Sequence, residues 1–270
     1  MTSINQGARE QSRLPEHMTL LLLCLAGLWL FMLQGRVLST GWIMAVWAAA
    51  TLVMLRGLFH RARVRRRAWR SAYLYPESPW NRRLRGGWLL MGVQFLKAAG
   101  LSAILLLTVV RVGAEPAFWR LMLVAILVLL LARMVTDRLF RHEASAIYRP
   151  ELVARVGQWV TGLLMVLCLL LWAFIQPQPD LRDATLEQAL WHATDQEVAA
   201  SELVQRGARA LAAWQGAEQW VAQMLTTMES SWWFRLGVWV SFLLRQSLFV
   251  VSFLVLLNGV LAGRLHDGER

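Results

Sequence analysis

The sequence predicts an all-α polytopic membrane protein with about six transmembrane helices. Of its 270 residues 57% are hydrophobic, and the mean hydropathy is +0.44, whereas soluble domains are usually about 45–50% apolar. The apolar residues also gather in blocks of about twenty, the helix length that crosses a hydrocarbon core of roughly 30 Å. We place the spans at residues 18–34, 39–57, 88–110, 117–136, 156–176 and 233–262.

Three proline-glutamate pairs indicate that the spans are arranged as three hairpins. Pro15-Glu16, Pro76-Glu77 and Pro150-Glu151 each lie shortly before a span. Proline suits the first turn of a helix because its missing N–H has no partner there, and an acid favours the positive end of the helix dipole. The first span is followed at once by a second, so we interpret it as an uncleaved span and not as a signal peptide. An internal duplication and three independent helix starts explain the repeated pairs equally well.

The distribution of arginine predicts the orientation. With the N-terminus in the cytoplasm, the inner segments carry 19 arginines and 8 acidic residues, and the outer segments carry 7 and 9. Basic residues gather in the loops that stay in the cytoplasm. Both termini are therefore expected in the cytoplasm of a bacterium, with the chain in the inner membrane.

These observations divide the chain into nine segments. They are a cytoplasmic tail (1–17), a first hairpin (18–57), a basic cytoplasmic or interfacial segment (58–87), a second hairpin (88–136), a cytoplasmic loop (137–155), a fifth span (156–176), periplasmic amphipathic helices (177–231), a sixth span (232–263) and a second cytoplasmic tail (264–270).

The basic segment predicts contact with anionic lipids. Its arginines would lie against the inner leaflet, where each basic residue contributes about 1 kcal/mol near the surface. We expect an interfacial helix, with a solvated loop as the alternative, and we expect no direct nucleic-acid binding. The arginines assigned to lipid contact are Arg61, Arg63, Arg65, Arg66, Arg67 and Arg70.

The outer segment predicts two amphipathic helices, at about 184–193 and 195–226. Thr194 to Glu197 reads as a capping box for the second helix, and Asp183 is a candidate cap for the first. Apolar residues recur at helical spacing through the second helix. This stripe needs a partner, which is the membrane surface, the other helix or another subunit.

The sequence contains no recognisable catalytic, cofactor or metal motif. All five histidines lie at span ends or in loops, so a haem held between spans is not expected. Cys24 and Cys168 lie singly in apolar runs and have no metal-ligand spacing. We therefore predict no catalytic residue, no cofactor and no metal, and a protein that is not an enzyme.

The candidate functional residues are two ionisable side chains deep in the apolar runs and one glutamine beside them. Lys97 lies inside the third span, and Arg245 lies beside Gln246 in the sixth. Insertion of an ionisable residue at the centre of a membrane helix costs at least about 2.5–3.5 kcal/mol, so we treat such a residue as a functional candidate. The sequence offers no acid at matching depth. The cations therefore snorkel to an interface, line a wet cavity, or meet a polar group of a partner.

Small residues mark two faces for helix packing. Ala99 and Ala103 lie beside Lys97 in the third span, and Gly259 and Gly263 form a G-x-x-x-G pair in the sixth. Small residues let helix backbones approach closely, which drives association in lipid.

A segment between the fourth and fifth spans resembles a known family. Asp137-Arg138-Leu139-Phe140-Arg141-His142-Glu143-Ala144-Ser145-Ala146-Ile147-Tyr148 is similar to a signature in membrane proteins of integrating conjugative elements, although Ala144 replaces a serine of that pattern. The likeness lies around residues 133–176. It implies a place beside type IV secretion machinery and no assigned enzymatic activity.

These features predict a non-enzymatic scaffold or anchor subunit of a multi-protein inner-membrane assembly, for which conjugative DNA transfer or secretion machinery is the candidate. The expected partners are anionic lipids of the bilayer and other membrane subunits. The alternative is a transporter or channel subunit that moves an anionic solute past Lys97 and Arg245.

Overall fold

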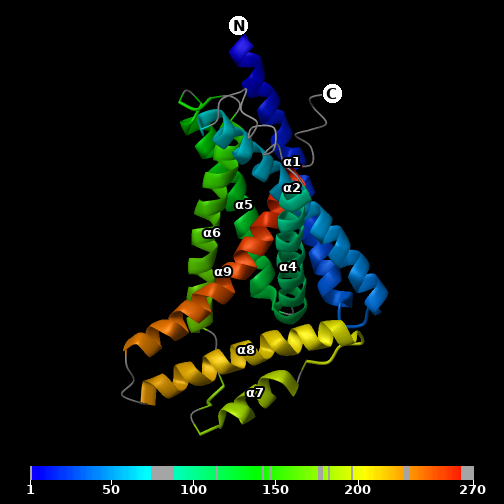
Figure 1. The fold of residues 1–270 in the computed structure, drawn as a ribbon, viewed down its shortest axis with the longest axis vertical. Helices are drawn as coiled ribbons and strands as arrows, with labels where there is room; N and C mark the ends of the chain where they lie inside the picture. The colour runs from blue at the N-terminus through cyan, green and yellow to red at the C-terminus, as the bar shows by residue number, and fades with distance from the viewer. Residues whose placement is uncertain are drawn as a thin grey trace.

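The described part of the chain is entirely helical. The computed structural model describes residues 2–73, 88–113, 115–141, 143–145, 148–175, 179–181, 183–195, 197–227 and 232–262. These residues form eight helices, drawn in Figure 1: α1 (Thr2–Gln34), α2 (Thr40–Tyr73), α4 (Trp88–Val112), α5 (Pro116–Leu139), α6 (Arg149–Ile175), α7 (Leu186–Asp195), α8 (Glu202–Thr227) and α9 (Trp232–Ala262).

Six helices within the described residues are long and apolar enough to cross a membrane, which confirms the predicted all-α polytopic class. Their apolar segments are Pro15–Gln34, Thr40–Arg66, Leu90–Val112, Pro116–Leu139, Arg149–Ala173 and Trp232–Ala262. The main difference is in α2, which continues through the basic segment to Tyr73 and does not end near residue 57. Arginine and alanine are good helix formers, so this stretch has no residue that stops the helix.

The helices do not all pack as the predicted hairpins would. Two of the hairpins would place α1 against α2 and α4 against α5, whereas the most extensive packing joins α2 with α4 and α5 with α6. The third predicted pair, α6 and α9, does pack together. Two hydrogen bonds tie α2 to α4: Trp47 Nε1 donates to the Ala99 carbonyl at 3.1 Å, and Thr51 and Ser102 join through their hydroxyls at 2.7 Å. The small side chains on α4 allow this approach, which chain connectivity alone does not reveal.

Helix α9 crosses the middle of the bundle (Figure 1) and packs on α2, α4 and α6. Its second half is almost wholly buried, from Phe249 to Leu261. It approaches α2 closely, because a Cβ added to Gly57 would lie 2.9 Å from the Gly259 Cα. A β-carbon at either glycine would push these two backbones apart.

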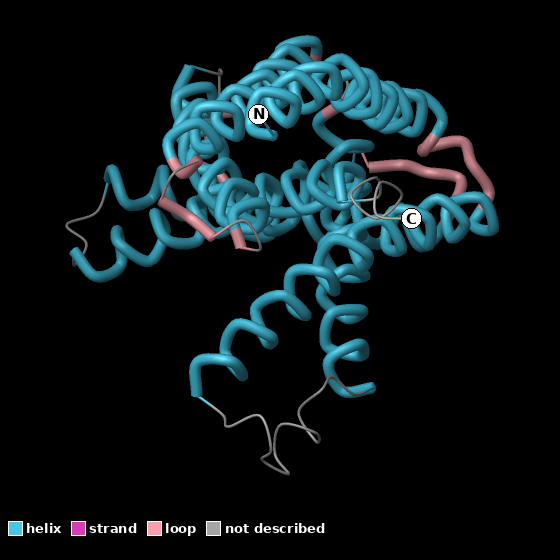
Figure 2. The backbone as a smooth tube through the Cα atoms, turned by 90° about the horizontal axis from the view of Figure 1, so that it is seen from above, coloured by secondary structure: helices cyan, strands magenta, loops and turns pink. Residues whose placement is uncertain are grey.

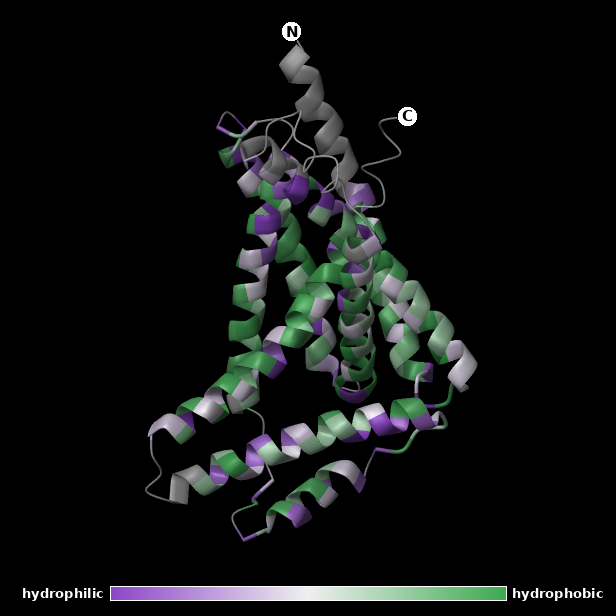
Figure 3. Cartoon of the chain, in the orientation of Figure 1, coloured by the Kyte–Doolittle hydropathy of each residue, from purple (hydrophilic) through white to green (hydrophobic). Residues whose placement is uncertain are grey.

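Helices α7 and α8 lie across one end of the bundle, with α8 against the ends of α4 and α9 (Figure 1). We call this the α8 end, and we call the opposite end, with the start of α1 and the finish of α9, the terminal end. Figure 2, the view from above, shows helices and loops and no strand among the described residues. Hydrophilic residues gather toward the two ends and along α7 and α8, and the helices between them are mostly hydrophobic (Figure 3).

The predicted cap of the second outer helix is wrong. Thr194 donates its hydroxyl proton to the Leu190 carbonyl at 2.9 Å within α7, and α8 begins only at Glu202. The reciprocal cap belongs instead to the start of α7, in place of the predicted Asp183. There Thr185 Oγ1 accepts the Gln188 N–H at 3.2 Å, and Gln188 Oε1 accepts the Thr185 N–H at 2.9 Å. This is a capping box with glutamine in the acidic position.

Part of the apolar stripe on α8 is covered by the protein itself. Val204, Ala208 and Ala212 are each at most 3% exposed. A Cβ added to Gly207 would meet the Leu107 side chain of α4, and one added to Gly216 would meet the side chain of Ala193 on α7. Of the three partners considered for the stripe, packing within the chain accounts for these residues.

Candidate functional site

Arg245 is paired within the chain, which corrects the expectation that no acid lies at its depth. Its Nε donates to Glu218 Oε2 of α8 at 2.8 Å, and the Glu218 side chain is only 7% exposed. Ser241 donates to the other carboxylate oxygen at 2.7 Å and accepts from Trp214 Nε1 at 3.0 Å. Helix α8 supplies the acid because it lies across the end of α9. Gln246 is half-buried beside this network.

A second ion-pair cluster holds the other end of α8. Glu197 accepts from Arg111 Nε at 3.0 Å and lies 3.6 Å from Arg36 Nη2. Next to it the Ala200 N–H donates to the Arg36 carbonyl at 2.8 Å. The glutamate that sequence reasoning placed in a helix cap therefore joins the α1–α2 turn, α4 and the segment before α8.

Lys97 points away from the bundle. It is exposed, and it makes no hydrogen bond or ion pair with another residue in the described ranges. Its neighbours on α4 are also exposed: Leu96 by 70%, Val93 by 48% and Phe95 by 45%. A Cβ added to Gly100 would meet nothing within 4 Å. Lys97 and Arg245 therefore lie in different environments and are not brought together.

The predicted packing residues have different surroundings. Ala99 is half-buried and accepts the Trp47 hydrogen bond, and Ala103 is also half-buried on α4. Gly259 lies against α2, where a Cβ would be 2.3 Å from the Val53 carbonyl oxygen. Gly263 lies outside the described residues.

The arginines predicted to contact lipid extend along the last turns of α2 toward the terminal end. Arg63 and Arg65 are exposed, and the Arg63 guanidinium lies 4.4 Å from the Phe59 ring centroid. Arg66 is half-buried. Arg67 and Arg70 belong to α2, but their side chains lie outside the described part. Arg61 differs from the rest because its Nη1 donates to Gln158 Oε1 of α6.

A second arginine inside the bundle, Arg133, was missed as a site residue by sequence reasoning. On α5, it donates from Nη2 to Asn258 Oδ1 of α9, and Asn258 Nδ2 donates to the Leu254 carbonyl at 2.7 Å. Arg61 and Arg133 are close enough to repel each other, and Glu151 lies within electrostatic range of both. The available signal was one arginine and one asparagine, each inside an apolar run at similar depth.

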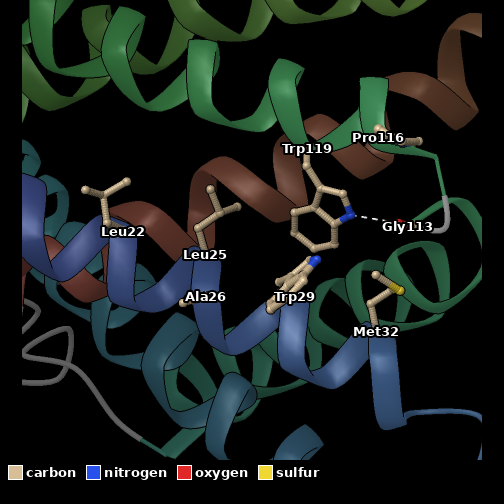
Figure 4. A pocket seen from close by; sticks show the side chains of 8 residues that line it. All are labelled: Leu22, Leu25, Ala26, Trp29, Met32, Gly113, Pro116 and Trp119. Atoms are coloured by element: carbon tan, nitrogen blue, oxygen red, sulfur yellow. Dashed lines mark hydrogen bonds between the residues drawn. The ribbon is translucent and has the colours of Figure 1, made fainter.

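An apolar groove lies between α1 and α5 (Figure 4). It has a volume of about 490 Å³ and is lined by α1 side chains between Leu22 and Met32 and by Gly113, Pro116 and Trp119. Trp119 Nε1 donates to the Gly113 carbonyl at 2.7 Å, which leaves few polar groups facing the groove. Its lining is almost entirely apolar.

An ion pair links the end of α5 to the start of α6. Arg149 Nε donates to Asp137 Oδ1 at 2.6 Å, and its Nη2 binds the second carboxylate oxygen. This fork joins the last turn of α5 to the first turn of α6. Comparison with protein families, curated proteins and solved structures finds no match for this chain.

Proposed function

We propose that this protein is a membrane scaffold or anchor subunit, and that the exposed face of α4 binds a transmembrane helix of a partner subunit. The observation that carries this proposal is Lys97, a cation on the outer face of an apolar helix. It lies nine residues after Trp88, which is about 14 Å along the helix. Left against lipid, such a group costs at least about 2.5–3.5 kcal/mol at a helix centre.

The exposed face of α4 around Lys97 is suited to packing against a partner helix. Gly92 and Gly100 have open space where a side chain would be, and with Leu96 between them they lie on one face at intervals of four residues. Small residues of this kind let a second backbone approach closely. A carboxylate on the partner helix would pair with Lys97, because a charge within lipid is stabilised by an opposite charge.

Other observations support a structural role over the alternative of an anion pathway. A pathway past both Lys97 and Arg245 needs them to share a cavity, but Lys97 faces outward and Arg245 is bound to Glu218. The local resemblance at Asp137–Tyr148 supports conjugative DNA transfer or secretion machinery as the larger assembly. Charge distribution supports the bacterial inner membrane as the location, with both termini in the cytoplasm.

Replacement of Lys97 by alanine or glutamate is expected to release the partner. Interhelical polar contacts in membranes contribute about 1 kcal/mol, so we expect roughly fivefold lower retention of the partner during purification from native membranes in mild detergent. Lys97→Arg should retain it because the charge is kept. A photo-crosslinking residue at Leu96 should capture the same protein, and one at Leu163, which is 76% exposed on α6, should not.

Two results would contradict this proposal. Unchanged retention in Lys97→Glu would show that the lysine snorkels to an interface. Loss of anion flux in proteoliposomes carrying Lys97→Ala, with the partner still bound, would favour the transporter. A chain that runs as a lone monomer and yields no crosslink would also remove the support for a scaffold.

Reporter fusions test the orientation. A periplasm-dependent enzyme such as alkaline phosphatase, fused after Arg67, should be inactive because the basic segment opposes translocation. The same enzyme fused after His192, between the fifth and sixth spans, should be active. The reverse pattern would invert the orientation and place α7 and α8 in the cytoplasm.

A further inference from the structure

Two arginines from different helices meet inside the bundle near its terminal end. Arg61 of α2 and Arg133 of α5 are both half-buried and lie within repelling distance of each other. Arg133 is also packed against α6, because a Cβ added to Gly157 would lie 3.0 Å from the Arg133 Cγ. Arginine stays protonated in proteins, so the two positive charges cannot be removed by loss of a proton.

Among the described residues, the groups around this pair do not neutralise it. Gln158 and Asn258 accept one hydrogen bond each, from Arg61 and Arg133 respectively, and both are uncharged. Glu151 is an acid within range of both arginines. Its single negative charge is opposed by Arg65 and Arg155, which add two more positive charges near Arg61. Both are exposed, and we call them the rim of the half-buried pair.

Two polar atoms at this place also have no hydrogen-bond partner in the part of the chain that the structure describes. Arg133 Nε is buried and makes no hydrogen bond within the described residues, and the same holds for Thr161 Oγ1 on α6. Thr161 is completely buried and follows Gly157 by four residues, which puts it on the same face of α6. Buried donors in folded proteins are nearly always satisfied, so these atoms indicate a missing acceptor.

The position of the arginine cluster along the bundle suits contact with a lipid headgroup. Arg133 lies six residues before Leu139, the last residue of α5, and this is about 9 Å along the helix. That position is close to where the hydrocarbon core gives way to lipid headgroups. Arg65 and Arg155 are exposed, so their guanidinium groups can be reached from outside the bundle.

We propose that Arg61 and Arg133, with Arg65 and Arg155 at the rim, bind a phosphate group, carried by an anionic phospholipid or present as free phosphate. A guanidinium presents two parallel N–H donors that match two phosphate oxygens. The ligand would supply the negative charge that the cluster lacks and an acceptor for Arg133 Nε. This site differs from diffuse attraction to the leaflet because its arginines come from three helices.

The test measures binding to the purified full-length chain in phosphatidylcholine nanodiscs. Phosphatidylglycerol at increasing fractions is one arm, and inorganic phosphate without phosphatidylglycerol is the other, each followed by the thermal unfolding midpoint and by native mass spectrometry. We expect Arg133→Gln and Arg61→Gln to weaken phosphatidylglycerol binding at least tenfold. Arg209→Gln is the matched control, since Arg209 is an exposed arginine of α8, at the opposite end of the bundle from the cluster, and it should change binding less than twofold.

Two further variants keep the test valid if Arg133→Gln does not fold. Arg155→Gln alters only the exposed rim and should weaken binding about threefold, and Glu151→Gln removes the competing acid and should strengthen it. Saturation by inorganic phosphate that excludes phosphatidylglycerol would assign the site to free phosphate. Equal losses in Arg209→Gln and in the cluster variants, or no change in any of them, would overturn the proposal.

Discussion

Replacement of Glu218 by glutamine is expected to lower the free energy of unfolding by about 3 kcal/mol, because removing one partner of a buried ion pair leaves the other charge uncompensated. The carboxylate is 7% exposed and the Arg245 side chain 21% exposed, and they meet at 2.8 Å. Ser241 also loses a charged acceptor. Since this network joins α8 to α9, we expect α7 and α8 to loosen from the bundle before the bundle itself unfolds.

Thermal unfolding in detergent and limited proteolysis between residues 179 and 227 measure this effect. The matched control is Glu202→Gln, which removes another ion pair of α8, with Arg206. Its side chains are 75% and 78% exposed, and exposed pairs contribute about 0–1 kcal/mol. Equal stability of the two variants would show that the Glu218–Arg245 pair does not hold α8 on the bundle.

Replacement of Gly259 by alanine is expected to lower the free energy of unfolding by about 2–3 kcal/mol, the cost of overpacking a well-packed core. The added Cβ would lie 2.3 Å from the Val53 carbonyl oxygen and 2.9 Å from its carbonyl carbon. These are backbone atoms of α2, so the clash cannot be relieved by a side-chain rotation. The helices α2 and α9 must move apart along a contact that runs through the centre of the molecule.

Gly27→Ala is the matched control for this second change. Gly27 is also inside a helix, and a Cβ there would meet nothing within 4 Å. Alanine is favoured over glycine in a helix interior by about 1 kcal/mol, so the control should be unchanged or slightly more stable. If denaturant titration in detergent gave both alanine variants the same stability, α2 and α9 would not approach as closely as the glycines indicate.

The candidate sites divide into those that a single helix defines and those that need several. Lys97 could be predicted as an isolated intramembrane cation, because depth along one apolar run is enough to find it. Arg245 could be found in the same way, but its partner could not: Glu218 is 27 residues earlier and on a helix that crosses the end of the bundle. The pair Arg61–Arg133 was missed for the same reason, since its members are 72 positions apart and meet only through helix packing.

The sequence contains capping-box patterns near the outer helices, but the start of the second outer helix was predicted at the wrong residue. The sequence contains two capping-box patterns, at Thr185–Gln188 and at Thr194–Glu197, and only the first caps a helix. At the second pattern, Glu197 forms ion pairs with Arg36 and Arg111 and does not cap a helix. A local hydrogen bond of modest strength gives way when ion pairs from other elements compete for the same side chain.

The sequence by itself determined that this is an all-helical chain with six long apolar helices, because helix length and hydropathy are properties of contiguous residues. It also determined where cations interrupt these helices. Which helices pack together, and which cations find a partner, was decided only by the tertiary structure. The reason is that side chains such as Gly57 and Gly259, or Glu218 and Arg245, act on each other only after the chain has brought distant helices into contact.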